Sequence, residues 1–136
     1  MGKCFSPDWY FASAFDITPD FLLSHGIKAV VLDIDNTLVT YGDAEPTEKV
    51  IGWVSALRSA GIKAAIASNN KEERVNLFNK KLGIFCISKS GKPSTKAVRT
   101  ACAEFSVSPG DTAVIGDQIF TDVLCANRAG AVAILT

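Results

Sequence analysis

The sequence lacks the features that mark several protein classes. No apolar run approaches the roughly 20 residues that a membrane-spanning helix needs. Asp8, Asp16 and Asp20 interrupt the apolar stretches near the N-terminus, so we expect no secretory signal. The formal net charge is zero, with 14 Lys and Arg against 14 Asp and Glu, so no overall basic field is present to hold nucleic acid. These absences predict a cytoplasmic protein without a nucleic-acid partner.

The four cysteines and the single histidine form no recognisable metal or disulfide pattern. Cys4, Cys86, Cys102 and Cys125 stand far apart, with no C-x-x-C pair and no neighbouring histidine to complete a zinc site. Three of them have apolar surroundings and are expected to be reduced thiols in the core. His25 stands at a predicted helix end, where a capping role is favoured over catalysis.

An apolar run that ends in two acids is the most informative stretch of the chain. The residues from Ile27 to Leu32 are nearly all apolar, as in a central strand of a parallel sheet that is covered on both faces. Asp33 and Asp35 follow, at the strand end where ligands bind in open α/β sheets. Two carboxylates so close repel each other unless a cation neutralises them, and Mg²⁺ takes such oxygen ligands. Taken alone, the same residues also suit an exposed turn that caps a helix.

Strand and helix patterns alternate along the rest of the chain. Further strands are predicted at 62–67, 84–87, 112–115 and 131–135, and helices at 46–60, 71–82, 93–105 and 123–129. This alternation predicts an α/β fold, a doubly wound three-layer sandwich in which helices cover both faces of a five-stranded parallel sheet.

The first 28 residues are rich in aromatic side chains. They contain six of the twelve Phe, Trp and Tyr residues, and Thr18 followed by Pro19 predicts a short helix. We expect this segment, residues 1–28, to pack on a core domain of residues 29–136. That role is favoured over contact with a membrane or a partner.

Polar residues that follow the strands should converge, because crossovers return every parallel strand to the same edge of the sheet. Besides the first two acids, these residues are Ser68, Asn69, Lys92, Asp117 and Asp122. Carboxylates would hold Mg²⁺, while Lys92, Ser68 and backbone N–H groups would neutralise phosphoryl oxygens. Asp33 is placed to act as a nucleophile, and Asp35 as a general acid and base.

These residues resemble the motifs of haloacid dehalogenase-like (HAD) phosphatases. Asp33-Ile34-Asp35-Asn36-Thr37 is similar to their D-x-D-x-T motif, and Ser68, Lys92 and the pair Asp117 and Asp122 resemble the later motifs in the same order. Further stretches, such as Ser68-Asn69-Asn70 and Gly116-Asp117-Gln118, resemble the bacterial YqeG group of subclass IIIA, which is related to phosphatidylglycerophosphatases. The resemblance covers nearly the whole chain.

The resemblance implies a role for each matching residue. Asp33 would be the nucleophile and a metal ligand, Asp35 the acid and base with its carbonyl group on the metal, and Asp117 a further metal ligand. Binding or support of the phosphoryl group would fall to Thr37, Ser68, Asn69 and Lys92. Asp122 would stand behind the metal ligands or share the metal through water. The cofactor would be Mg²⁺, and relatives usually continue beyond the last strand, so a further segment is expected after Thr136.

The predicted function is Mg²⁺-dependent hydrolysis of a phosphomonoester through an aspartyl-phosphate. HAD phosphatases usually carry a cap domain, inserted after the first strand or before the lysine motif, and only residues 38–45 and 88–91 stand at these places. Such short stretches leave the site open. An open site suits a phosphate on something large, such as the lipid phosphatidylglycerophosphate, with peripheral membrane contact. A capless phosphatase for a small molecule is the alternative.

Two other classes share parts of this pattern. A response-regulator receiver domain also places acids, a hydroxyl and a lysine around Mg²⁺, but no acid follows the strands that end at Ala67 and Ile87, where its phosphoacceptor would belong. A catalytically silent HAD-fold interaction module would keep the fold alone, and the presence of all the motif residues favours an enzyme. No pattern in the sequence specifies the oligomeric state.

Overall fold

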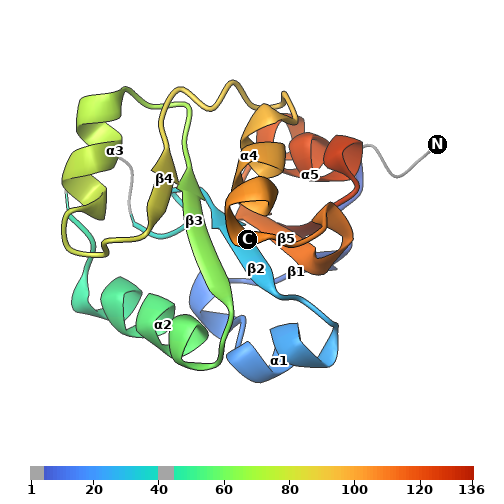
Figure 1. The fold of residues 1–136 in the computed structure, drawn as a ribbon, viewed down its shortest axis with the longest axis horizontal. Coiled ribbons are helices and arrows are strands. Elements are labelled where there is room, and N and C mark those ends of the chain that lie inside the picture. The colour runs from blue at the N-terminus through green and yellow to red at the C-terminus, as the bar shows by residue number, and fades with distance from the viewer. Residues whose placement is uncertain (1–4, 40–44) are drawn as a thin grey trace.

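The computed structural model describes residues 5–39 and 45–136. Within these ranges, six parallel strands form one sheet in the order β1-β6-β5-β2-β3-β4 (Figure 1). The strands are β1 (Trp9–Tyr10), β2 (Ala29–Leu32), β3 (Lys63–Ala67), β4 (Phe85–Ile87), β5 (Thr112–Gly116) and β6 (Val132–Leu135). Five of them lie where the sequence predicts strands.

The prediction of a five-stranded sheet is wrong by one strand, because β1 extends the sheet beyond β6. Trp9 lies opposite Ile134 in this parallel pair. Asp8 joins the two strands twice: its N–H donates to the carbonyl of Ala133 at 2.8 Å, and its carboxylate accepts from the N–H of Ala133 at 2.8 Å. A strand of two residues has no alternation of apolar and polar side chains, so a sequence pattern cannot reveal it.

Helices connect the strands. In the described part of the chain these are α1 (Pro19–Ser24), α2 (Glu48–Ser59), α3 (Glu72–Asn79), α4 (Lys96–Phe105) and α5 (Leu124–Ala129), with a π-helical turn at Ile119–Val123 and 3₁₀ turns at Ala14–Asp16 and Pro109–Asp111. The Thr18 hydroxyl accepts from the N–H of Phe21 at 3.0 Å and so caps α1. His25 ends α1, with its Nδ1 2.8 Å from the carbonyl oxygen of Phe21, which confirms the predicted capping role.

Helices cover both faces of the sheet (Figure 1). Val30 and Leu32 of β2 belong to one apolar core with residues of α1, α2 and α3, whereas Val31 belongs to the other core with residues of α4 and α5. None of these three β2 side chains is more than 2% exposed. The two cores confirm the predicted α/β sandwich of three layers and the central place of its first predicted strand.

The N-terminal segment contributes to the core that contains α2. Ile17 and Leu22 are completely buried there. Trp53 of α2 donates from its indole N–H to the carbonyl of Ile17 at 2.9 Å, and the ring of Phe15 lies edge-on to Trp53 with 5.9 Å between centroids. These contacts join the segment to α2, while the division of the chain between residues 28 and 29 stays a prediction.

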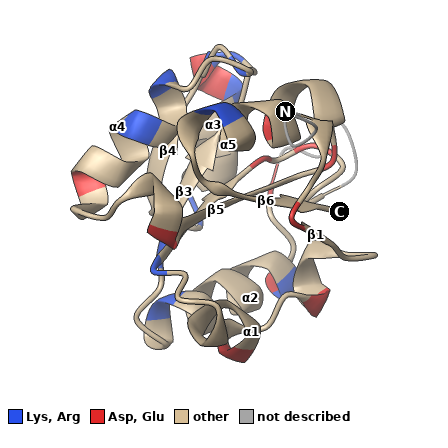
Figure 2. Cartoon of the chain, turned by 90° about the vertical axis from the view of Figure 1, so that its right-hand side faces the viewer, with Lys and Arg blue, Asp and Glu red and all other residues tan. Residues whose placement is uncertain are grey.

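The described residues between β2 and α2, and between β4 and α4, form no additional domain, in agreement with the predicted capless fold. Residues 40–44 of the first connection lie outside the described ranges, as does Cys4. Cys102 and Cys125 are buried free thiols, and Cys86 is half-buried. In the ranges 5–39 and 45–136, no helix is long and apolar enough to cross a membrane. Acidic and basic positions are interspersed over the helices (Figure 2).

Candidate active site

A cavity of about 210 Å³ opens at the carboxyl ends of the central strands. Its walls bring together five of the predicted site residues, Asp33, Asp35, Ser68, Asn69 and Lys92, with Asn36, Asn70, Gln118 and Thr121 beside them. The predicted convergence of the strand ends therefore occurs.

Lys92 lies between two carboxylates. Its Nζ donates to Oδ1 of Asp33 at 3.2 Å and to Oδ1 of Asp122 at 2.6 Å, and its side chain is only 3% exposed. Burial opposes the charged form, but the neighbouring Asp122 and Asp33 carboxylates outweigh it and raise the pKa of Lys92. The site therefore contains a buried ammonium group that stays charged.

Asn69 fixes the loop that carries Lys92. Its Oδ1 accepts from the backbone N–H of Lys92 at 3.0 Å and from the hydroxyl of Ser90 at 2.7 Å, while its Nδ2 donates to the carbonyl of Lys92 at 3.2 Å. The side chain at the end of β3 thus holds both backbone groups of Lys92. Its predicted direct contact with phosphate stays a prediction.

The pKa values of Asp33 and Asp117 are both raised. Burial and the nearby Asp122 raise the pKa of Asp33 to about 6, although Lys92 acts in the opposite direction. Burial and Asp122 also raise the pKa of Asp117. Burial is the larger cause of both shifts, and a cation placed between the two carboxylates would favour their charged forms.

The same acids fit a divalent cation. One oxygen from each of Asp33, Asp117 and Asp122 can lie within 4.8 Å of the other two. Among the described residues, Oδ1 of Asp117 is buried and has no hydrogen-bond partner. A hard cation such as Mg²⁺ binds carboxylate oxygens, and here an oxygen of Asp117 without a partner lies near the carboxylate of Asp33. Asp33 and Asp117 are therefore the ligands that the geometry favours.

Asp35 is held from the side of α3. Its Oδ2 accepts from Nδ2 of Asn70 at 2.8 Å, and its Oδ1 forms an ion pair with Nη2 of Arg74 at 2.8 Å. The Arg74 guanidinium also lies over the ring of Phe78, 5.7 Å from its centroid. Sequence reasoning assigned no role to Arg74 or Asn70. Their position just after the strand end of Ser68 is the signal that could have indicated them.

Ser68 and Thr37 are both buried near this edge. The Ser68 hydroxyl accepts from the backbone N–H of Asn70 at 3.1 Å and from its Nδ2 at 2.9 Å. Thr37 is 7% exposed, and its Oγ1 has no hydrogen-bond partner in the part of the chain that the structure describes. Their roles in phosphate binding stay predictions.

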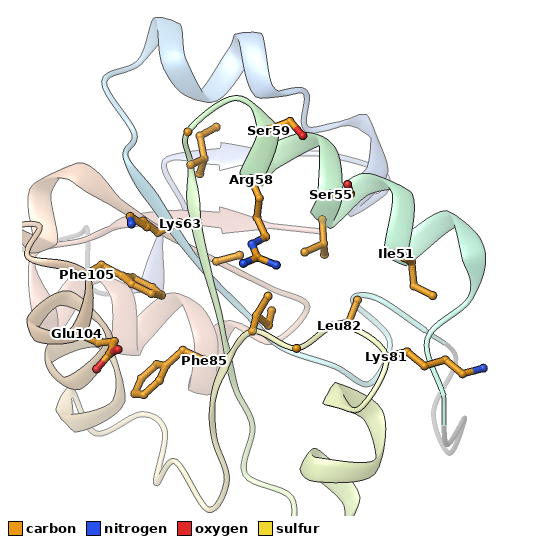
Figure 3. A pocket seen from close by; sticks show the side chains of 16 residues that line it. Ile51, Ser55, Arg58, Ser59, Lys63, Lys81, Leu82, Phe85, Glu104 and Phe105 are labelled. Carbon is orange, nitrogen blue, oxygen red and sulfur yellow. The ribbon is translucent and has the colours of Figure 1, made fainter.

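A larger cavity, of about 810 Å³, lies at the other end of the sheet (Figure 3). It lies between α2, the first residues of β3 and β4, and the end of α4, with Arg58, Lys63 and Phe85 among its walls. None of the predicted site residues lines it. Because ligands of open α/β sheets bind at the carboxyl ends of the strands, the smaller cavity is the candidate active site.

Comparison with known proteins agrees with this fold. The family model described as haloacid dehalogenase-like hydrolase matches residues 40–130, which include Ser68, Lys92, Asp117 and Asp122. The chain belongs to this family of hydrolases, and the predicted enzyme class, a HAD-type phosphatase, is confirmed. It is 42% identical over 130 residues to Probable phosphatase YqeG of Bacillus subtilis (strain 168), across 96% of this chain and 76% of that protein.

Solved structures with the same fold include two phosphatases. The cobalt-bound deoxy-D-mannose-octulosonate 8-phosphate phosphatase of Haemophilus influenzae has a TM-score of 0.66 and 22% identity, across 80% of this chain and 68% of that one. The 3-deoxy-D-manno-octulosonate 8-phosphate phosphatase of Moraxella catarrhalis, with magnesium, phosphate and KDO bound, has a TM-score of 0.56 and 22% identity, across 69% and 59%. At this identity the likeness concerns the fold.

Proposed function

We propose that the chain is an Mg²⁺-dependent phosphomonoester hydrolase in which Asp33 forms an aspartyl-phosphate. The contact of 3.2 Å between the Lys92 ammonium and Asp33 carries the proposal. A buried cation beside a carboxylate at a strand end offers a dianionic phosphoryl group a place next to its nucleophile. The carboxylates of Asp33 and Asp117 add a place for a divalent cation.

The reaction would take place in two steps. A carboxylate oxygen of Asp33 attacks phosphorus, the bond from phosphorus to the leaving oxygen breaks, and Asp35 gives that oxygen a proton. Water then attacks the phosphorus of the aspartyl-phosphate while Asp35 takes a proton from it, and inorganic phosphate leaves with Asp33 restored. Throughout, the Lys92 ammonium neutralises charge on the phosphoryl oxygens. Mg²⁺ held by Asp33, Asp117 and the carbonyl of Asp35 would supply further positive charge at those oxygens.

The open site extends the proposal to the kind of substrate. Since no cap stands over the described part of the site, a phosphate on a large molecule can approach Asp33. A lipid phosphate such as phosphatidylglycerophosphate suits this opening, with the N-terminal segment in peripheral contact with the membrane. The alternative is a small phosphate ester. The ratio of kcat/KM for phosphatidylglycerophosphate in mixed micelles to kcat/KM for soluble sugar phosphates distinguishes the two.

Hydrolysis of p-nitrophenyl phosphate, with Mg²⁺ and with EDTA, tests the reaction itself. We expect release only with Mg²⁺, no measurable release by Asp33→Asn, and a phosphorylated Asp33 after acid quenching of the native enzyme. Asp111→Asn is the matched control, since Asp111 is a partly exposed acid that pairs with Lys28. An active Asp33→Asn enzyme would exclude the covalent step, and no metal-dependent hydrolysis of any ester in a broad panel would favour the interaction module.

A further inference from the structure

The π-helical turn that carries Asp122 also exposes large apolar side chains. Ile119 is 38% exposed and Phe120 is 74% exposed. Phe5, which is 51% exposed, packs edge-on against Phe120 with 5.7 Å between the ring centroids. Together, Phe5, Ile119 and Phe120 form the rim patch.

The turn that carries Ile119 and Phe120 also contributes to the wall of the catalytic cavity. Gln118 and Thr121, the residues on either side of Ile119 and Phe120, both line that cavity. The hydroxyl of Thr121 donates to Oε1 of Gln118 at 3.0 Å, and the N–H of Asp122 donates to the carbonyl of Gln118 at 2.9 Å. The turn is thus closed by its own hydrogen bonds, with Gln118 and Thr121 at the cavity and the exposed Ile119 and Phe120 between them in the chain.

The cavity is smaller than the pockets that enclose drug-sized ligands. Its volume is about 210 Å³, whereas pockets that enclose a drug-sized ligand measure roughly 300–1,000 Å³. A phosphoryl group beside Asp33 and Lys92 takes up part of this volume, so a longer leaving group must extend over the edge of the cavity. Contiguous exposed apolar patches that are rimmed by polar residues mark ligand-binding grooves and sites of protein or membrane contact.

We infer that the rim patch binds an apolar part of the leaving group, so that the enzyme prefers phosphate monoesters whose leaving group carries a hydrocarbon segment. The inference rests on the proposed hydrolase function. Phe120, as the most exposed member, is the specificity-determining residue, with Phe5 supporting its ring. The patch consists of three side chains beside the cavity wall, which suits one substrate molecule better than a bilayer surface.

A series of linear alkyl phosphates, from ethyl to octyl, tests the inference below their micelle concentrations. The leaving alcohols have similar acidity, so chain length changes mainly the apolar area. We expect kcat/KM to rise by up to about fourfold for each methylene group that the patch covers. Phe120→Ser should remove most of this rise, and Phe120→Leu should keep much of it. Leu23→Ser is the matched control, because Leu23 is 49% exposed on α1, which precedes β2 at the opposite end of the sheet.

Each of the following results would overturn the inference. The inference is refuted if kcat/KM depends equally on chain length in the native enzyme and in Phe120→Ser. It is also refuted if kcat/KM of the native enzyme does not depend on chain length. In both cases, hydrolysis of ethyl phosphate would still support the proposed function. No hydrolysis of any ester with Mg²⁺ refutes both. If the native protein shows no chain-length dependence but sediments with phosphatidylglycerol vesicles, and Phe120→Ser does not, the patch is a membrane contact instead.

Discussion

The carboxyl group of Asp122 lies where a side chain on Gly116 would begin. A Cβ atom built on Gly116 would overlap the carboxyl carbon and Oδ2 of Asp122. Gly116 is the last residue of β5, so the missing side chain lets the following π-helical turn pack back against the strand end. This close approach allows Asp122 to meet Lys92 at 2.6 Å.

Gly116→Ala should therefore displace Asp122 and, with it, the ammonium of Lys92. We expect kcat for p-nitrophenyl phosphate to fall by about 10²-fold, since a displacement of 1 Å in a catalytic site has effects of that size. Gly52→Ala is the control: nothing lies within 4 Å of a Cβ at this α2 position, so activity should not change and unfolding should become harder by about 0.5–1 kcal/mol. Native activity in Gly116→Ala would contradict the role given to this contact.

Arg74→Gln should impair turnover through Asp35. The ion pair of 2.8 Å between Arg74 and Asp35 orients the proposed general acid and base. Loss of this orientation is expected to reduce kcat by about 10- to 10²-fold with a smaller change in KM, because the lost interaction concerns proton transfer more than binding. Arg58→Gln, at an exposed arginine in the larger cavity, is the matched control. A change confined to KM would show that Arg74 contacts the substrate instead.

The pKa of Asp33 predicts how the stability of the metal-free protein depends on pH. This pKa rises from 3.8 to about 6 on folding. Between these values the folded protein keeps a proton that the unfolded chain has lost, so this group lowers the free energy of unfolding as pH rises, and its contribution is constant above pH 6. Thermal unfolding in EDTA from pH 4 to pH 8 should show a shallower decline for Asp33→Asn than for the native chain. Parallel profiles would contradict the shift.

Mg²⁺ should stabilise the native protein through Asp117. At a Mg²⁺ concentration of 100 times its Kd, the free energy of unfolding should increase by about 2.7 kcal/mol. The rise in Tm should be smaller at pH 5 than at pH 7.5, because protons compete for carboxylates whose pKa values are raised. Asp117→Asn should lose most of the rise, and Asp111→Asn should keep it. An equal rise in Asp117→Asn would exclude Asp117 as a ligand.

The sequence predicts that the strand ends converge, but it does not predict which side chains contact one another there. Apolar runs mark the strands, and the rule that parallel strands end at one edge brings Lys92 and Asp33 together across 59 positions of the chain. That Lys92 also binds Asp122, and that Asn69 binds the loop instead of standing free, depends on side-chain geometry. A pattern of residue types does not contain this information.

Arg74 shows why a functional contact can escape sequence reasoning. In the predicted helix 71–82 it is one of several charged residues, and such residues usually face solvent. Whether it turns to solvent or to Asp35 depends on the rotation of α3 about its axis, which the burial of Val75 and Phe78 determines. The π-helical turn at Ile119–Val123 is equally hidden from sequence reasoning, because the close approach of its Asp122 to Gly116 is a contact in three dimensions.

The hydrogen bonds between Asn69 and the loop that carries Lys92 affect which steps turnover requires. Enzymes with a cap complete part of their site when the cap closes, and this movement can limit the rate. Here one amide group holds the loop, and Lys92 contacts Asp33 directly. No closing movement is needed to bring these two groups together, so their assembly adds no conformational step to turnover.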